Sequence, residues 1–220
     1  MNASTASPLD ARIVRTRTQL RKAALSLAAD SPIADVSVSD LTRAAGINRA
    51  TFYKHAQSPS EVLEEALLED LNQMREGFLI ASLDSPSDFE TTWRRAVEDT
   101  VKHVERFESV YTHGFTESSD GSLKALLARH ISTSMVELFH SSPELIPNAT
   151  EESFEFFVNA YAAAIGASLT AVLGAWLGSP DRDIEKYAIA VLNVLPDWMR
   201  NSSANEVVQK TEPQASLENL

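Results

Sequence analysis

The sequence predicts an all-α protein. Apolar residues recur at helical spacing through most of the chain, whereas no segment alternates apolar and polar residues as a strand does. Groups of Pro, Gly, Ser and Asp separate the helical segments. The chain has 220 residues, of which 44% are hydrophobic and 23% charged, and these proportions are ordinary for a globular protein. A fibrous or largely disordered protein is therefore not expected.

The first predicted helix covers residues 11–30, because Leu20, Ala23, Ala24, Leu27 and Ala28 share one face and Asp30-Ser31-Pro32 ends it. Residues 1–10 before it are expected to be disordered. Further apolar-periodic segments, each bounded by helix breakers, are residues 59–82, 87–108, 122–141, 150–178 and 181–195. Residues 201–220 are polar enough to form a disordered tail.

Charge is distributed unevenly along the chain. The formal net charge is −12, yet residues 1–58 carry eight Lys and Arg against four acidic residues, a net charge of +4. The remaining eleven basic and twenty-seven acidic residues give −16. A basic end on an acidic body favours binding of a polyanion at that end alone. This asymmetry indicates two functional parts.

Residues 39–55, SDLTRAAGINRATFYKH, predict two short helices around a glycine turn. Ser39 is expected to cap the first helix, with Leu41, Ala44 and Ala45 facing inward. Gly46 can end that helix in the left-handed conformation, and Asn48 can cap the second helix. Phe52 would point into the core. This arrangement is a helix-turn-helix, whose second helix fits the major groove of DNA.

The polar side chains of the second helix carry the functional prediction. Arg49 can donate two hydrogen bonds to guanine, and Ala50 or Thr51 can contact a thymine methyl group. Hydroxyl and basic groups nearby suit the phosphates. The expected DNA contacts are Ser37, Ser39, Arg43, Asn48, Arg49, Ala50, Thr51, Tyr53, Lys54 and His55. From the turn alone, a plain helical hairpin with a solvated face is the alternative; the spacing of caps and turn and the basic segment favour DNA.

Residues 36–63, VSVSDLTRAAGINRATFYKHAQSPSEVL, resemble the signature of the tetracycline-repressor (TetR) family, and the match extends back through residues 19–25, QLRKAAL. The resemblance covers the first quarter of the chain. It implies a DNA-binding domain at residues 11–58, a connecting helix at about 59–82, and a helical regulatory and dimerisation domain over residues 59–200. Ala28 and Ala56 depart from the family, which usually has aromatic residues there, and Pro59 replaces a common basic residue.

The resemblance also implies a homodimer built from the last two helices, residues 150–178 and 181–195. Small side chains on the first of these helices would let helix backbones approach closely, although packing within one chain would also use them. The expected interface residues are Ala163, Ala167, Ala171, Gly174, Ile184, Tyr187 and Val191.

A ligand pocket among the body helices is a further implication of the family. The aromatic and soft apolar residues there suit a small apolar or aromatic ligand that releases the DNA. Candidates are Phe78, Trp93, Val97, Phe107, Tyr111, Phe115, Met135, Phe139, Phe157 and Tyr161. The alternative is a helical, dimeric DNA-binding or scaffolding protein that acts through protein partners without such a ligand.

Other functional classes find little support in the sequence. The chain lacks cysteine, a glycine-rich phosphate loop, GxSxG and HExxH, so we expect no enzyme, no cofactor and no metal site. The N-terminus has no signal-peptide pattern, and Gly and Ser interrupt the apolar run at residues 160–177. We therefore expect a cytoplasmic protein that does not span a membrane.

Overall fold

The computed structural model describes residues 8–84, 88–115 and 121–200, and every regular element within these ranges is a helix. The prediction of an all-α fold is therefore confirmed. The predicted tail at residues 201–220 and most of the predicted N-terminal disorder, residues 1–7, lie outside the described residues. Residues 8–10, which we expected to be disordered, form the first turn of a helix.

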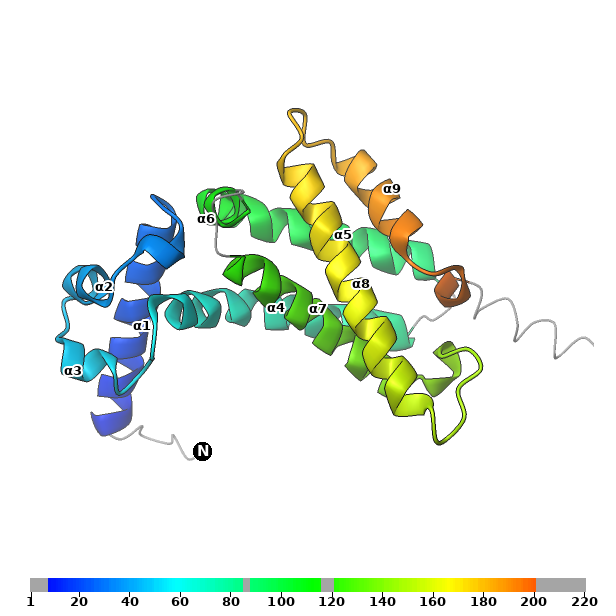
Figure 1. The fold of residues 1–220 in the computed structure, drawn as a ribbon, viewed down its shortest axis with the longest axis horizontal. Coiled ribbons are helices and arrows are strands. Elements are labelled where there is room, and N and C mark those ends of the chain that lie inside the picture. Colours follow the sequence, from blue (N-terminus) through cyan, green and yellow to red (C-terminus); the bar gives the residue numbers. More distant parts are fainter. Residues whose placement is uncertain (1–7, 85–87, 116–120, 201–220) are drawn as a thin grey trace, which may run out of the picture. The chain divides into compact units, whose positions relative to one another are not determined.

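The chain forms two compact units, and each unit combines separate stretches of the sequence. Unit 1 consists of Met1–Met74 and Asp99–Ala128, and unit 2 consists of Arg75–Glu98 and Arg129–Leu220. Three helices, α4 (Pro59–Asp84), α5 (Phe89–Arg106) and α7 (Ser122–Ser141), therefore each contribute residues to both units (Figure 1).

Unit 1 contains α1 (Pro8–Ala28), a 3-10 turn η1 (Ile33–Asp35), α2 (Val38–Ala45), α3 (Arg49–Phe52) and α6 (Glu108–Gly114), with parts of α4, α5 and α7. Helix α1 packs against α2 and α6. The core of this unit is closed by fully buried side chains from several of its helices, namely Leu20, Ala24, Leu41, Phe52, Leu67 and Tyr111.

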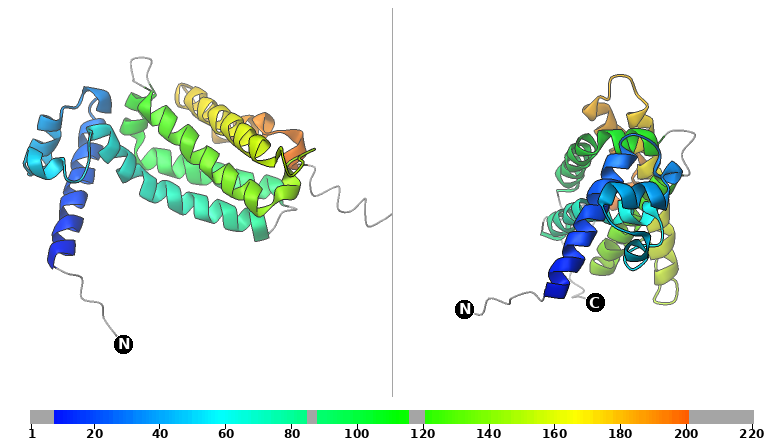
Figure 2. Two further views of the ribbon diagram at one scale, coloured as in Figure 1. Left: turned by 60° about the horizontal axis from the view of Figure 1, so that its bottom comes forward. Right: turned by 90° about the vertical axis from the view of Figure 1, so that its left-hand side faces the viewer.

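Unit 2 contains a 3-10 turn η2 (Pro143–Leu145), α8 (Phe154–Leu177) and α9 (Ile184–Val194), with the rest of α4, α5 and α7. Helices α8 and α9 lie side by side (Figures 1 and 2), and the rings of Trp176 and Tyr187 stack between them at 5.2 Å. An ion pair of 3.0 Å between Arg94 and Glu185 joins α5 to α9.

The main departure from the predicted elements lies at residues 87–108. Instead of one helix, α5 ends at Arg106 and α6 begins at Glu108, because Phe107 leaves helical geometry with φ −118° and ψ 32°. Neither Pro nor Gly marks this break, so the local sequence carried no signal for it. The predicted helix 150–178 begins later, at Phe154, because Thr150 and Ser153 exchange hydrogen bonds that hold a turn.

Helix α8 is long and apolar enough to cross a membrane by length and composition, with a mean hydropathy of 1.7. This finding does not contradict the expectation that the protein does not span a membrane. Within the chain, 39% of the apolar window is buried, and a core helix of a water-soluble protein passes the same test. The helix alone is weak evidence for a membrane span.

Candidate nucleic-acid interface

The turn between α2 and α3 has the geometry that its residues dictate. Gly46 ends α2 with φ 67° and ψ 31°, the left-handed conformation that an L side chain disfavours. Its backbone N–H donates to the carbonyl of Arg43 at 3.3 Å, and the N–H of Ile47 donates to that of Thr42 at 3.1 Å. The chain therefore turns within three residues and α3 begins at Arg49.

Both short helices have side-chain caps, and one of the predicted caps is wrong. Asn48 caps α3 as predicted, because its Oδ1 accepts from the backbone N–H of Thr51 at 2.7 Å. Helix α2 is capped by Ser37, whose Oγ accepts from the N–H of Asp40 at 3.1 Å, and not by Ser39, which lies exposed inside the helix. The acidic residue three positions after Ser37 is the signal for this choice.

The inward faces of α2 and α3 fix the angle between the two helices. Leu41 and Phe52 are fully buried, Ala45 is buried, and Ile47 is half-buried at the corner. The expectation that Ala44 faces inward is wrong, because Ala44 is exposed. Thr42 takes the buried position, and its hydroxyl donates to the carbonyl of Val38 at 2.8 Å, so this buried hydroxyl is satisfied.

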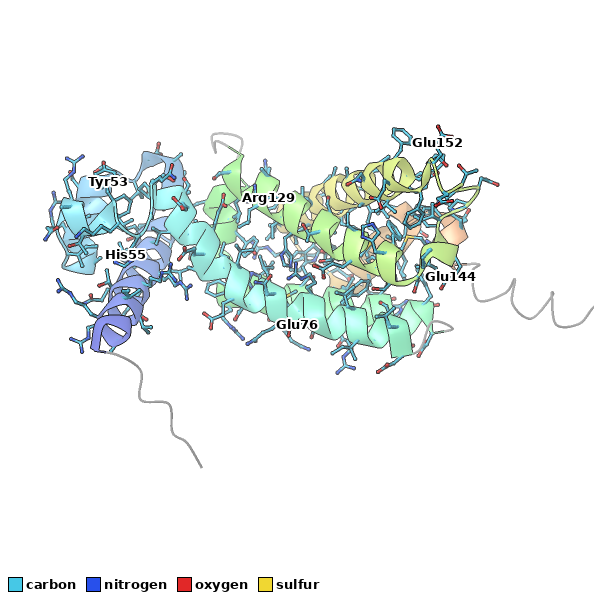
Figure 3. All side chains as sticks on the ribbon, turned by 90° about the horizontal axis from the view of Figure 1, so that it is seen from below. Tyr53, His55, Glu76, Arg129, Glu144 and Glu152 are labelled. Carbon is cyan, nitrogen blue, oxygen red and sulfur yellow. The ribbon has the colours of Figure 1, made fainter. Side chains whose placement is uncertain are left out.

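The outward face of α3 and the residues after it bear polar side chains. Arg49, Ala50, Tyr53 and Lys54 are exposed, whereas Thr51 and His55 are half-buried. Tyr53 is 55% exposed, and Figure 3 shows both it and His55 on this part of the chain. The ring of Tyr53 meets that of Phe52 edge-on at 5.2 Å, so the buried Phe52 holds it in place.

Arg49 is oriented along this face by Tyr53, because its Nη2 donates to the tyrosine hydroxyl at 3.4 Å. Neither Arg49 nor Lys54 has an acidic partner among the residues that the structure describes. Two uncompensated positive charges therefore lie on the outer side of the helix-turn-helix, a suitable arrangement for a polyanion.

Two residues at α2 that we expected to bind phosphates already have side-chain hydrogen-bond or ion-pair partners, unlike Lys54 within the described residues. Arg43 Nη1 pairs with Asp40 Oδ1 at 2.9 Å, and the Ser37 hydroxyl donates to Asp40 Oδ2 at 2.6 Å. Hydrogen bonding from Ser37, and then from Arg43, lowers the pKa of the Asp40 carboxyl. Because Asp40 stays ionised beside it, Arg43 contributes less positive charge to a DNA surface than its sequence position suggested.

The pocket candidates are divided between the two units. Phe107, Tyr111 and Phe115 belong to unit 1, where the buried His103 bonds the Tyr111 hydroxyl through Nε2 at 2.6 Å. In unit 2, Phe78 meets Trp93 at 5.0 Å, and Val97 and Met135 are buried. A further group in unit 2 consists of Phe139, Phe157, Tyr161 and Trp198.

Trp198 was not among the predicted pocket residues, although its ring lies 5.1 Å from Tyr161 and 5.9 Å from Phe139. It follows Pro196, beyond the last predicted helix, and the position of a lone aromatic after a proline gives no periodicity to detect. No group of three His, Cys, Asp or Glu residues within the described ranges could hold a metal ion.

The candidates for a dimer interface separate into exposed and buried residues. Ala163, Ala167, Ala171 and Ile184 are exposed, and Gly174 is partly exposed. Tyr187 and Val191 are buried within the chain itself, where Tyr187 stacks on Trp176. These two residues contribute to the packing of unit 2.

The capped turn, the buried wedge of apolar side chains and the uncompensated cations define a DNA-binding helix-turn-helix domain. A family model described as "Bacterial regulatory proteins, tetR family" matches residues 20–66, which contain this site. Residues 20–66 are thus similar to the DNA-binding part of the tetR family, in agreement with the resemblance seen in the sequence. The family description names regulatory proteins, and the curated relatives are named as HTH-type transcriptional regulators.

Curated relatives align with part of the chain. It is 38% identical over 82 residues to the uncharacterized HTH-type transcriptional regulator YxbF of Bacillus subtilis (strain 168), an alignment that covers 37% of this chain and 21% of the relative. It is 37% identical over 73 residues to the HTH-type transcriptional regulator EthR of Mycobacterium tuberculosis, which covers 33% of this chain and 34% of EthR. The chain thus spans about a third or less of each of these relatives.

The chain is similar in structure to the dihydroxyacetone kinase operon activator DhaS. The aligned region covers 81% of this chain and 93% of the DhaS chain. The TM-score is 0.47 and the sequence identity 18%, values at which the likeness carries no argument about function.

Proposed function

We propose that this protein is a transcriptional repressor that binds a near-palindromic operator as a homodimer and is released from it by a small apolar or aromatic ligand. The observation that carries the proposal is the outward face of α3, where Arg49 and Lys54 lack acidic partners among the described residues of a capped and buried helix-turn-helix. Its site of action would be the cytoplasm, where the operator DNA lies.

Within the DNA surface, we assign different roles to the two cations. The Arg49 guanidinium can donate two hydrogen bonds to guanine O6 and N7, and its contact with the Tyr53 hydroxyl orients it along the outer face of α3. Ala50 and Thr51 would contact thymine methyl groups. Lys54, Tyr53 and His55, which follow the helix, would contact phosphates, together with Ser39. Ser37 and Asn48 would act mainly as caps, and Arg43 as a weaker phosphate contact.

Dimerisation is supported by an apolar face that one protomer leaves uncovered. The exposed residues of α8 include Ala163, Ala167 and Ala171, which recur every four residues. Their small side chains would let the same helix of a second protomer approach closely. One four-residue recognition helix per chain reads few base pairs, and a two-fold dimer would double the recognised sequence.

Release of DNA by a ligand is supported by the aromatic side chains of unit 2. The cluster of Phe139, Phe157, Tyr161 and Trp198 offers stacking surfaces from three separate segments of unit 2. A ligand releases DNA only if it binds the form with low DNA affinity more tightly than the other form. Helix α4 contributes to both units and is the element through which we expect the two sites to be coupled.

The proposal can be tested by selecting duplexes from a random-sequence pool with the wild-type protein and measuring binding by fluorescence anisotropy. We expect Arg49→Ala to weaken binding to the selected duplex by about 1–3 kcal/mol and to relax the base preference at one base pair per half-site. Lys54→Ala should weaken binding to all duplexes and lower the salt slope by about 0.9 for each Lys54 that contacts a phosphate, of which the proposed dimer has two. Arg95→Ala, at an exposed arginine of α5, is the matched control and should bind as wild type.

Equal and sequence-independent reductions in affinity for Arg49→Ala and Lys54→Ala would remove Arg49 from its reading role. A wild-type protein that selects no sequence would contradict the proposal. A metabolite library added to the selected complex then tests release. A protein that binds its operator and responds to no compound would favour the alternative, a DNA-binding dimer that acts through protein partners.

A further inference from the structure

The N-terminal half of α1 makes little contact with the rest of unit 1. Of residues 11–19, all but Thr16 are exposed, whereas residues 20–28 include the buried Leu20, Ala23, Ala24 and Ala28. Figures 1 and 2 show this end of the helix reaching past α2 and α3. The core of unit 1 therefore does not explain why these turns are helical or what they contact.

Three arginines lie on this projecting end, namely Arg12, Arg15 and Arg17, and all three are exposed. None has an acidic partner among the described residues. The contrast with Arg21 on the same helix is informative, because Arg21 lies 3.7 Å from a carboxylate oxygen of Glu65 and 3.4 Å from one of Glu69. The charges of α1 are thus neutralised close to α4 and left uncompensated at the projecting end.

We propose that Arg12, Arg15 and Arg17 form a second DNA contact that binds backbone phosphates beside the groove that α3 occupies. Arg12 precedes the buried Leu20 by eight residues, which places it about 12 Å further along the helix axis. The inference rests on the proposed function and adds to it a sequence-independent contact.

The chemistry of the three side chains favours phosphates as their ligands. A guanidinium presents a planar set of donors that matches two phosphate oxygens, and it remains charged at any physiological pH. The remainder of the chain after residue 58 carries a net charge of −16 and would repel DNA. Three added cations per protomer would offset part of that repulsion in the unit that bears α3.

The test measures the salt dependence of DNA binding, using a labelled duplex selected by the wild-type protein and an unrelated duplex of equal length. In the triple variant Arg12→Ala, Arg15→Ala and Arg17→Ala, we expect the slope of log affinity against log salt to fall by about 0.9 for each arginine that binds a phosphate. Affinity should fall about 8-fold per such arginine at roughly 0.1 M salt, by the same factor on both duplexes. The corresponding triple Lys variant should keep the wild-type slope.

Controls separate this inference from the proposed function. The three arginines are exposed, so circular dichroism should show an unchanged helical content and melting temperature. Arg95→Ala removes a charge from unit 2 and should leave both duplexes bound as before. A triple Ala variant with the wild-type slope would overturn the phosphate contact, as would weaker binding confined to the selected duplex. If Arg49→Ala still relaxes base preference, the proposed function stands; a wild-type protein that binds neither duplex overturns both.

Discussion

At the scale of single residues, the short helix α3 depends on Asn48. The helix has four residues, too few to be stable from its own backbone hydrogen bonds. The Asn48 side chain satisfies the N–H of Thr51, and the buried Phe52 anchors the far end. The geometry of the candidate DNA surface is therefore controlled by one exposed amide and one buried ring.

We predict that Asn48→Ala lowers the free energy of unfolding by about 0.5–2 kcal/mol, because the Thr51 N–H loses its acceptor. Asn48 is exposed, so no core packing is disturbed. Urea denaturation followed by circular dichroism measures the change, and Asn48→Asp, which keeps an acceptor oxygen, is the control. Equal stability of Asn48→Ala and the wild type would show that the cap contributes nothing.

A second residue-scale prediction concerns Asp181, in the loop between α8 and α9. Hydrogen bonds from Lys186, and then from Ser179, lower its pKa to about 2. A carboxyl whose pKa is lowered in the folded state stabilises that state above its ordinary pKa of 3.8, and this contribution is lost as the pH falls toward 2. Lys186→Ala should therefore raise the Asp181 pKa toward 3.8. Carbon-detected NMR titration measures it, and an unchanged midpoint would remove Lys186 as the main cause.

At the scale of elements, we expect glycine to stabilise the fold at the end of α2 and to destabilise it inside α4. Gly46 has a left-handed backbone at the end of α2, while Gly77 lies exposed inside the long helix α4. A Cβ atom at either position would meet nothing within 4 Å. Differences in stability on substitution should therefore come from the backbone and not from side-chain clashes.

We predict that Gly46→Ala destabilises the protein by about 1–2 kcal/mol, the cost of a left-handed alanine. Gly77→Ala should instead stabilise it by about 0.5–1 kcal/mol, because alanine loses less backbone freedom in a helix. The pair can be compared by thermal and urea denaturation. Gly46→Asn, which tolerates the left-handed region better, should fall between Gly46→Ala and the wild type. A shift of the same sign at both glycines would contradict the backbone argument.

At the scale of the whole molecule, the proposed dimer depends on the small exposed side chains of α8. We predict that Ala167→Trp shifts the protein from dimer to monomer, because a large ring would keep the two α8 backbones apart. Ala167 is exposed, so the fold of the protomer should be retained. Analytical ultracentrifugation measures the mass, and Ala125→Trp, at an exposed alanine of α7, is the matched control. A monomeric Ala167→Trp that binds a selected duplex with wild-type affinity would refute the need for a dimer.

The helix-turn-helix could be predicted closely because its signals are local. The αL glycine, the Asn48 cap and the buried Leu41 and Phe52 are all separated by a few residues, and short-range sterics and hydrogen bonds determine such a unit. The errors within it, Ser39 as the cap and Ala44 as an inward residue, are shifts of one or two positions. Helix ends are assigned less reliably than helix existence for this reason.

The sequence by itself determined the helical class, the similarity of the N-terminal domain to the tetR family and the glycine turn between α2 and α3, because periodicity, caps and turn residues act over a few positions. Tertiary structure alone decided what depends on contacts between distant segments. Ion pairs of Arg21 with α4 neutralise one cation of α1, while Arg12, Arg15 and Arg17 have no acidic partner in the part of the chain that the structure describes. Packing between distant segments likewise buries Tyr187 and Val191, which we expected at a dimer interface, and places the ring of Trp198 beside that of Tyr161. Such pairings are long-range packing outcomes that local sequence does not encode.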